Sequence, residues 1–262
     1  MSLIEEKGLE NNRSKGRIKL ISNMVSRPVY SRNNQFAGSY YKLKDSDWPF
    51  SDPLDLRQLR QAHGSLVFVL DLLRVMESDC QKYSHDMSEK QSQENLYFLN
   101  VGRTIITSAY ICKEIVTTAA RISSLGGRLV VMISGSVITD PRLLSSFFRN
   151  YAALIDEGVT LGMQFDAYIN DPALPEFVLK ALRFVCLNPF AVGMPKGPDS
   201  VSYPDVMYAG EVVREIHNRL DVKIVATQIV TSWQERVVKS LPVHYMLGSF
   251  FGGYKELVRA QQ

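Results

Sequence analysis

From residue 96 onward, short apolar runs alternate with longer segments in which apolar residues recur every three to four positions. Short apolar runs are typical of strands buried on both faces, and the longer period is typical of amphipathic helices. The predicted strands are 96–101, 128–133, 159–165, 189–194, 222–226 and 243–247. The predicted helices are 104–124, 140–156, 174–185 and 203–220. Two further helices are expected, one that begins near Thr231 and a last one after the glycines that follow residue 247. This order requires a parallel sheet covered by helices.

The number of consecutive strand–helix units predicts how the sheet is arranged. So many units in a chain of 262 residues favour an α/β fold of the TIM-like (β/α) barrel type. An open, doubly wound sheet is the structural alternative. Neither a GxGxxG motif nor a P-loop is present to support a nucleotide-binding version of that sheet.

The N-terminal part of the chain departs from this alternation. Residues 1–25 form a polar stretch without periodicity, which predicts a flexible arm preceding a barrel domain at 26–262. The runs 28–31 and 35–43, separated by Arg32-Asn33-Asn34, predict two strands of a hairpin. A helix is expected from Pro53 to about residue 80, with Ser51 and Asp52 at its start, and a polar surface loop at 82–94.

Composition excludes several classes of protein. The net charge of +3 is not gathered in any stretch, so direct nucleic-acid binding is not expected. The three cysteines are widely spaced and include no CxxC pair, which argues against both a zinc site and a disulfide framework. The longest apolar run, 66–73, is too short for a membrane span and contains Asp71. The first 17 residues are polar and contain no stretch like the apolar h-region of a signal peptide, so none is expected. The expected location is the cytoplasm.

The C-terminal segment KIVATQIVTSWQERVVKSLPVHYMLGSFFGGY (223–254) resembles the end of an EAL domain. The family pattern there is roughly K-V-I-A-E-G-V-E-T, E-Q, a short helix, and D-Y-V-Q-G-Y-F-F-G. Four further segments resemble the family in the right order: 28–44, 96–102, 129–141 and 158–166. The resemblance spans residues 28–258 and implies a barrel whose first strands form a hairpin.

EAL domains that hydrolyse cyclic di-GMP use two divalent cations, which require several carboxylate ligands. The resemblance places the family's metal-binding and catalytic positions on Tyr40, Asn100, Met132, Gln164, Phe165, Gly193 (the lysine), Thr227 and Leu247 (the glutamine). Only the asparagine is retained. Asp166 lies one place beyond the paired aspartates, and such a shift puts a side chain on the opposite face of a strand.

These replacements predict a pseudoenzyme with no metal and no cofactor. A phenol has an ordinary pKa of about 10, and a thioether is too soft for Mg²⁺, so neither Tyr40 nor Met132 replaces a carboxylate. If the end of the barrel that holds these positions still binds cyclic di-GMP, the candidate residues are Tyr40, Lys44, Asn100 and Asp166. Tyr41 is a candidate second ring for stacking on a base. The alternative is that Tyr40 only fills the space that the metals occupied.

Three functions follow from the resemblance. The first is a non-catalytic regulator that contacts another protein in bacterial signalling, such as the control of motility, biofilm formation or virulence genes. The second is a cyclic di-GMP receptor, and the third is a residual cyclic di-GMP phosphodiesterase. The N-terminal arm, the 82–94 loop and the aromatic residues of 250–254 are candidate contact surfaces. A homodimer is also conceivable, although 167–172 departs from the family's dimer loop.

Overall fold

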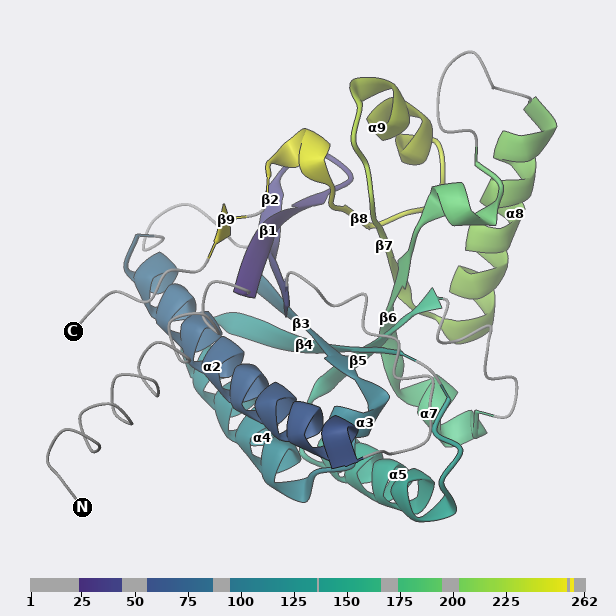
Figure 1. Cartoon of the computed structure of the whole chain (residues 1–262). Coiled ribbons are helices and arrows are strands. Elements are labelled where there is room, and N and C mark those ends of the chain that lie inside the picture. The colour runs from purple at the N-terminus through teal and green to yellow at the C-terminus, as the bar shows by residue number, and fades with distance from the viewer. Residues whose placement is uncertain are drawn as a thin grey trace, which may run out of the picture.

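The strands of the computed structural model form a barrel (Figure 1). The structure describes residues 24–43, 56–86, 95–135, 137–165, 174–194, 203–253 and 255–256. Its strands are β1 (Met24–Ser31), β2 (Phe36–Leu43), β3 (Asn95–Gly102), β4 (Gly127–Ser134), β5 (Thr160–Gln164), β6 (Leu182–Leu187), β7 (Lys223–Ala226), β8 (Tyr245–Met246) and β9 (Lys255–Glu256).

The order of the strands closes the sheet. From β2 to β8, each strand lies parallel to the next one in the sequence. β1 then runs antiparallel to both β8 and β2 and so joins the two ends. The short β9 pairs with the first part of β1. The prediction of a closed barrel that begins with a hairpin is confirmed, and the open sheet is excluded.

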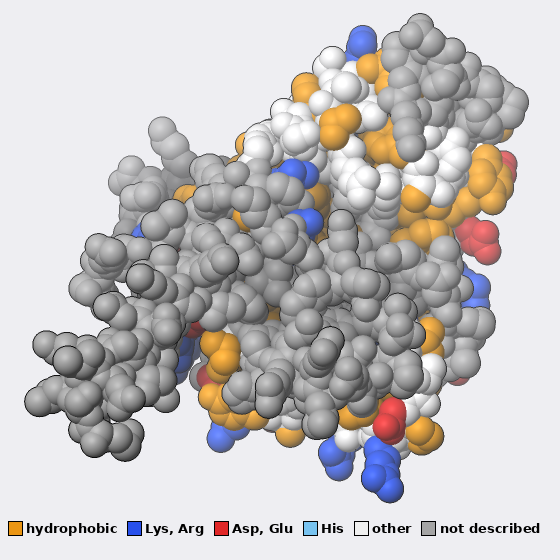
Figure 2. All heavy atoms as spheres, in the orientation of Figure 1, with side chains coloured by type: hydrophobic (Ala, Val, Ile, Leu, Met, Phe, Trp, Pro, Cys, Tyr) orange, Lys and Arg blue, Asp and Glu red, His pale blue; other side chains and the backbone are white. Residues whose placement is uncertain are grey.

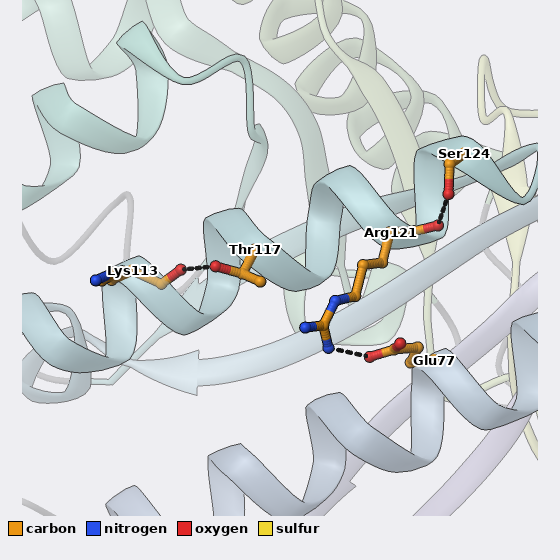
Figure 3. Close-up of polar contacts among 5 residues, drawn as sticks. All are labelled: Glu77, Lys113, Thr117, Arg121 and Ser124. Atoms are coloured by element: carbon orange, nitrogen blue, oxygen red, sulfur yellow. Dashed lines mark hydrogen bonds and ion pairs between the residues drawn. The ribbon is translucent and has the colours of Figure 1, made fainter.

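Helices surround the barrel. They are α2 (Leu56–Asp86), α3 (Arg103–Ile106), α4 (Ala109–Ser124), α5 (Pro141–Asp156), α7 (Glu176–Ala181), α8 (Tyr203–Leu220), α9 (Ser232–Lys239) and the 3₁₀ turns η1 (Pro189–Val192) and η3 (Ser249–Phe251). α2 lies beside α4, where Arg121 donates to Glu77 across 3.2 Å (Figure 3). Within the described ranges, no helix combines the length and the apolar character needed to cross a membrane.

Local signals account for where several helices begin. The Asp140 carboxylate accepts from the backbone N–H groups of Arg142 and Leu143, and Pro141 occupies the first helical position of α5. The hydroxyl of Thr231 accepts from the N–H of Gln234 and so caps α9. These capping groups satisfy N–H donors that have no partner within the helix.

In several strands, such as β3, β4 and β6, alternate residues enter two separate cores. The larger core lies between the barrel and its helices and includes Leu99, Val131 and Val185. The smaller one fills the barrel interior and includes Phe98, Met132 and Cys186. Since successive strand residues point to opposite faces, membership of the smaller core identifies the side chains that face inward.

Of the predictions for residues 174–194, the helix is confirmed only in its first part, and the placement of the strand was wrong. The helix α7 ends at Ala181, the strand β6 occupies Leu182–Leu187, and η1 lies where a strand was expected at 189–194. The apolar run LRFVCL fits the end of a helix or a strand, and its pairing with β5 and β7 decides for the strand. Pro189 cannot donate to a sheet and begins the 3₁₀ turn instead.

Other boundaries also moved. The helix expected at 104–124 is divided into α3 and α4 at Thr107–Ser108, and α2 continues to Asp86 into the predicted loop. β1 begins at Met24 and Val25 is fully buried, so these two residues belong to the sheet, and the rest of the arm predicted at 1–25 lies outside the described residues. The strand β9 stands where a last helix was expected. The predicted helix start at 51–53 and the remainder of the 82–94 loop lie outside the described residues.

Candidate functional site

The C-terminal ends of the parallel strands meet at one end of the barrel, which is where barrel enzymes place their reactive groups. The structure brings to this end six of the eight positions that the resemblance singled out. Tyr40 lies in β2, Asn100 in β3, Met132 in β4, Gln164 in β5, Thr227 directly after β7 and Leu247 directly after β8. We call this end of the barrel the mouth.

The side chains of Tyr40 and Gln164 meet inside the mouth. The Nε2 of Gln164 donates a hydrogen bond to the Oη of Tyr40 at 2.7 Å. The Tyr40 side chain is buried, and its ring stacks on Phe98 with a centroid distance of 6.3 Å. A neutral amide and a neutral phenol therefore pair with each other where the resemblance places two carboxylates.

Met132 adds an apolar side chain to the same interior and is fully buried. It lies against Gly162 of β5, where an added Cβ would come within 2.4 Å of the Met132 Sδ and 2.9 Å of the Phe184 Cβ. Glycine at 162 therefore leaves the space that the methionine fills. Met132 and Gly162 together fill this part of the barrel interior with packed apolar volume.

Asn100 is the one position at which the resemblance predicts that the family's residue is kept, and its amide oxygen has no hydrogen-bond partner in the described part of the chain. This oxygen, Oδ1, is buried. A buried acceptor without a donor costs about 1–3 kcal/mol, which makes this atom a candidate contact for a ligand. Arg103, three residues further on, is also almost fully buried and brings a positive charge to the first turn of α3.

Thr227 and Leu247 continue the strands rather than lining an open site. The backbone N–H and the hydroxyl of Thr227 donate to the carbonyl of Leu187 at 2.8 and 3.3 Å. Leu247 is buried in the interior core, and its N–H donates to the carbonyl of Ala226. Neither side chain offers a ligand to a hard cation.

Two of the predicted positions do not face the mouth. Gly193 lies beyond β6 in a left-handed conformation that ends η1, so it is not the strand position of the family's lysine. Phe184 and Cys186 are the β6 residues that face the barrel interior. Phe165 follows β5 and packs against the outer core. Lys44 and Asp166 lie outside the described residues.

Tyr41 points away from the mouth, so it is not the second stacking ring that was considered. Its hydroxyl donates to the Asp79 carboxylate of α2 at 2.8 Å. Burial raises the pKa of Tyr41 well above its ordinary value, and the Asp79 charge raises it further. Tyr41 therefore remains a neutral donor that ties β2 to α2.

Sequence reasoning missed a polar pair at the rim of the mouth. Asn188 follows β6 and Gln228 follows β7, and the Nδ2 of Asn188 donates to the Oε1 of Gln228 at 3.0 Å. Gln228 has a left-handed backbone with φ of 62°. A polar residue directly after an apolar strand is the signal that could have identified Asn188, but the strand was expected further along the chain.

The donor set of the mouth limits its chemistry. Among the residues that the structure describes, no three His, Cys, Asp or Glu side chains gather as metal ligands would. The described groups named above are the phenol of Tyr40, the hydroxyl of Thr227, the thioether of Met132 and four amides, those of Asn100, Gln164, Asn188 and Gln228. They can donate and accept hydrogen bonds, but they supply no negative charge to hold Mg²⁺ or Mn²⁺.

Comparison with solved structures identifies the fold. An EAL domain protein from Listeria monocytogenes EGD-e matches with a TM-score of 0.58 and 14% identity over 91% of each chain. The FimX EAL domain of Xanthomonas citri in complex with c-diGMP matches with a TM-score of 0.56 and 13% identity over 99% of each chain. The PaMucR phosphodiesterase, in a c-di-GMP complex, matches with a TM-score of 0.57 and 14% identity. This match covers 89% of this chain and 96% of that one.

The chain therefore has the fold of an EAL domain, as its sequence predicted. No model of a known protein family matches the sequence, and no curated protein does either. What the chain shares with these structures is the barrel fold, since identities of 13–14% show similarity of fold alone.

Proposed function

We propose that this chain is a non-catalytic EAL-fold protein that regulates bacterial signalling by contact with another protein. The observation that carries the proposal is the hydrogen bond between Gln164 and Tyr40 inside the mouth. It satisfies two neutral groups with each other, where a two-metal hydrolase needs carboxylates. Met132 supports the proposal because its buried thioether occupies a third position of the same set.

Exposed apolar side chains support the contact with a protein partner. Met207 and Tyr208 on α8, Val230 before α9 and Phe250 in η3 are 49, 60, 53 and 41% exposed. Val230 and Phe250 lie close together because the N–H of Phe250 donates to the carbonyl of Ile229. Hydrophobic side chains also gather over the region of α8 in Figure 2. Exposed aromatic residues and methionine are typical of protein interfaces.

The first experiment measures turnover. The purified chain is incubated with cyclic di-GMP and either Mg²⁺ or Mn²⁺, and the linear product is followed by chromatography. We expect no product above the level of a heat-denatured sample. Hydrolysis that depends on the metal would overturn the proposal in favour of a residual phosphodiesterase.

Retention of cyclic di-GMP binding is the second candidate function, and the unpartnered Oδ1 of Asn100 favours it. A guanine or ribose donor could complete this acceptor. Calorimetric titration with cyclic di-GMP decides between the two functions. Micromolar binding that Asn100→Ala weakens at least tenfold would make the chain a receptor, whereas absence of heat supports the partner-binding role. In that case the contact surface is tested by affinity capture of a partner protein. The variants Phe250→Ser and Val230→Ser should capture less of it, and Val67→Ser on α2 is the matched control.

A further inference from the structure

A cavity of about 1170 Å³ lies at the opposite end of the barrel from the mouth. It is lined by residues at the beginnings of the parallel strands, such as Arg128 of β4, Thr160 of β5, Lys223 of β7 and Tyr245 of β8. Barrel enzymes rarely place a site at this end. We call it the basal cavity.

The charges that line the basal cavity are mostly positive. The described residues that line it include four cationic side chains, Arg32, Arg128, Arg183 and Lys223, and one carboxylate, that of Asp221. The whole chain contains 30 Lys and Arg against 27 Asp and Glu, so its overall balance does not explain this excess. On the face shown in Figure 2, by contrast, the visible Lys and Arg side chains are scattered.

Lys223 provides an uncompensated charge in this cavity. Its ammonium group lies 5.9 Å from the ring centroids of both Phe184 and Tyr245. No ion pair joins Lys223 to any residue in the described ranges. The aromatic rings favour a cation at this place, and its three N–H donors remain directed to solvent or to a ligand.

Two of the arginines also have donors to spare. A terminal nitrogen of Arg183 donates to the carbonyls of Lys180 and Leu182, and one of Arg32 donates to the carbonyl of Lys239. These bonds complete the ends of α7 and α9. Each guanidinium has five N–H donors, so the bonds leave further donors free for an oxyanion.

Two histidines line the wall of the cavity, and one of them, His244, responds to its positive charges. The rings of His217 and His244 lie 5.1 Å apart, and the Nδ1 of His244 accepts from the N–H of Ile224. Burial lowers the pKa of His244, and the charges of His217, Lys223 and Arg32 lower it further. Because Nδ1 is an acceptor, the neutral ring carries its proton on Nε2 and offers one more donor.

We propose that the basal cavity binds a small phosphate-bearing anion, held by Lys223 and the guanidinium groups of Arg183 and Arg32. An oxyanion with two or more charges matches both the excess of cations and the forked donors of arginine. The cavity, at about 1170 Å³, is slightly larger than a typical small-molecule pocket of about 300–1,000 Å³ and so has room for such an anion with its water. This inference concerns a different end of the barrel from the mouth and stands independently of the function proposed above.

The test is calorimetric titration of the full chain with inorganic pyrophosphate at low ionic strength. Lys223→Met keeps the aliphatic stem over the rings and removes the charge, and Arg183→Gln removes one guanidinium. We expect saturable binding by the natural sequence and a loss of about tenfold in each variant, since each removes a charged donor. Raising the salt to 0.5 M should weaken the binding as well.

Matched controls separate the cavity from a general effect of charge. Lys113→Met on α4 (Figure 3) and Arg149→Gln on α5 remove the same charges from exposed positions elsewhere and should bind within twofold of the natural sequence. Circular dichroism shows whether each variant is folded. If Arg183→Gln unfolds because its contacts with the end of α7 are lost, the binding measured for Lys223→Met alone tests the proposal. Absence of saturable heat, or equal losses in the control and cavity variants, would overturn the proposal.

Discussion

Gln164 donates a hydrogen bond to the phenol oxygen of Tyr40, from β5 across the mouth to β2, over a separation of 124 residues. The bond satisfies the amide of the half-buried Gln164 with the hydroxyl of the buried Tyr40, and it needs neither a metal nor a proton transfer. With Met132 packed beside Gly162, it gives the mouth the character of a core rather than of an open polar site. The predictions below test this character and the environment of the buried titratable groups.

Tyr40→Phe should destabilise the protein by about 1–2 kcal/mol, because the Gln164 amide loses its acceptor while the ring packing on Phe98 is kept. Urea unfolding followed by circular dichroism measures the change as a lower midpoint with an unchanged slope. Tyr110→Phe is the control, since that residue is 60% exposed and its replacement should alter stability by less than about 0.5 kcal/mol. Equal stability of the two variants would contradict the importance of the pair.

Gly162→Ala should cost about 1–3 kcal/mol, because the new methyl group overlaps the Met132 Sδ and approaches the Phe184 Cβ within 2.9 Å. Combining it with Met132→Ala should recover part of the loss, since removing the thioether makes room for the methyl group. Thermal unfolding of the single and double variants measures this coupling.

The matched control is Gly253→Ala, which adds a methyl group where no heavy atom lies within 4 Å. It should leave the melting temperature nearly unchanged. Strictly additive losses in the Gly162 and Met132 double variant would show that the two residues do not share a packing space.

Stability should fall between pH 7.5 and pH 5.5, in part because of His244. Burial and the neighbouring positive charges hold the pKa of His244 below its ordinary value of about 6.5. As the pH falls through this range, the unfolded chain takes up a proton on His244 before the folded chain does. The contribution of the neutral His244 to stability is therefore present above pH 6.5 and is lost as the pH falls. His244→Asn keeps an acceptor near the Ile224 N–H and should flatten the dependence, as measured by urea unfolding at each pH. An unchanged slope would show that His244 does not contribute.

All three cysteines should resist thiol reagents in the folded protein, because all three are buried. Burial raises the pKa of Cys112 to about 11, so at pH 8 about one thiol in a thousand is ionised. Burial also raises the pKa of Cys80. Ellman's reagent should detect less than one thiol in an hour in the native chain and three in guanidinium chloride. Rapid native labelling would mean that a cysteine becomes exposed by local opening.

Local signals made much of the fold predictable. The strand at 128–133 and the helix that begins at Asp140-Pro141 were expected from an apolar run and from a cap before proline, and β4 and α5 confirm both. The run at 182–187 carries no such signal, because its residues suit a helix or a strand equally well. Pairing with β5 and β7 settles it, and pairing is a property of the assembled sheet.

The candidate site, like the fold, was predictable from the sequence only in part. Aligned segments were enough to place Tyr40, Met132 and Gln164 at the ends of their strands, since each lies in a well-patterned run. They failed for Gly193, because the strand before it was displaced, and Phe165 proved to face the outer core. A shift of one residue reverses the face of a strand, so positions near strand ends are the least secure.

By itself, the sequence determined the alternation of strands and helices over most of the chain and the absence of carboxylates at Tyr40, Met132 and Gln164, because residue type and periodicity are local properties. Only the tertiary structure decided that Gln164 meets Tyr40 and that Lys223 and Arg183 converge on one cavity. Those contacts exist because β1 closes the barrel and brings strands distant in sequence around a common axis, which no spacing along the chain records.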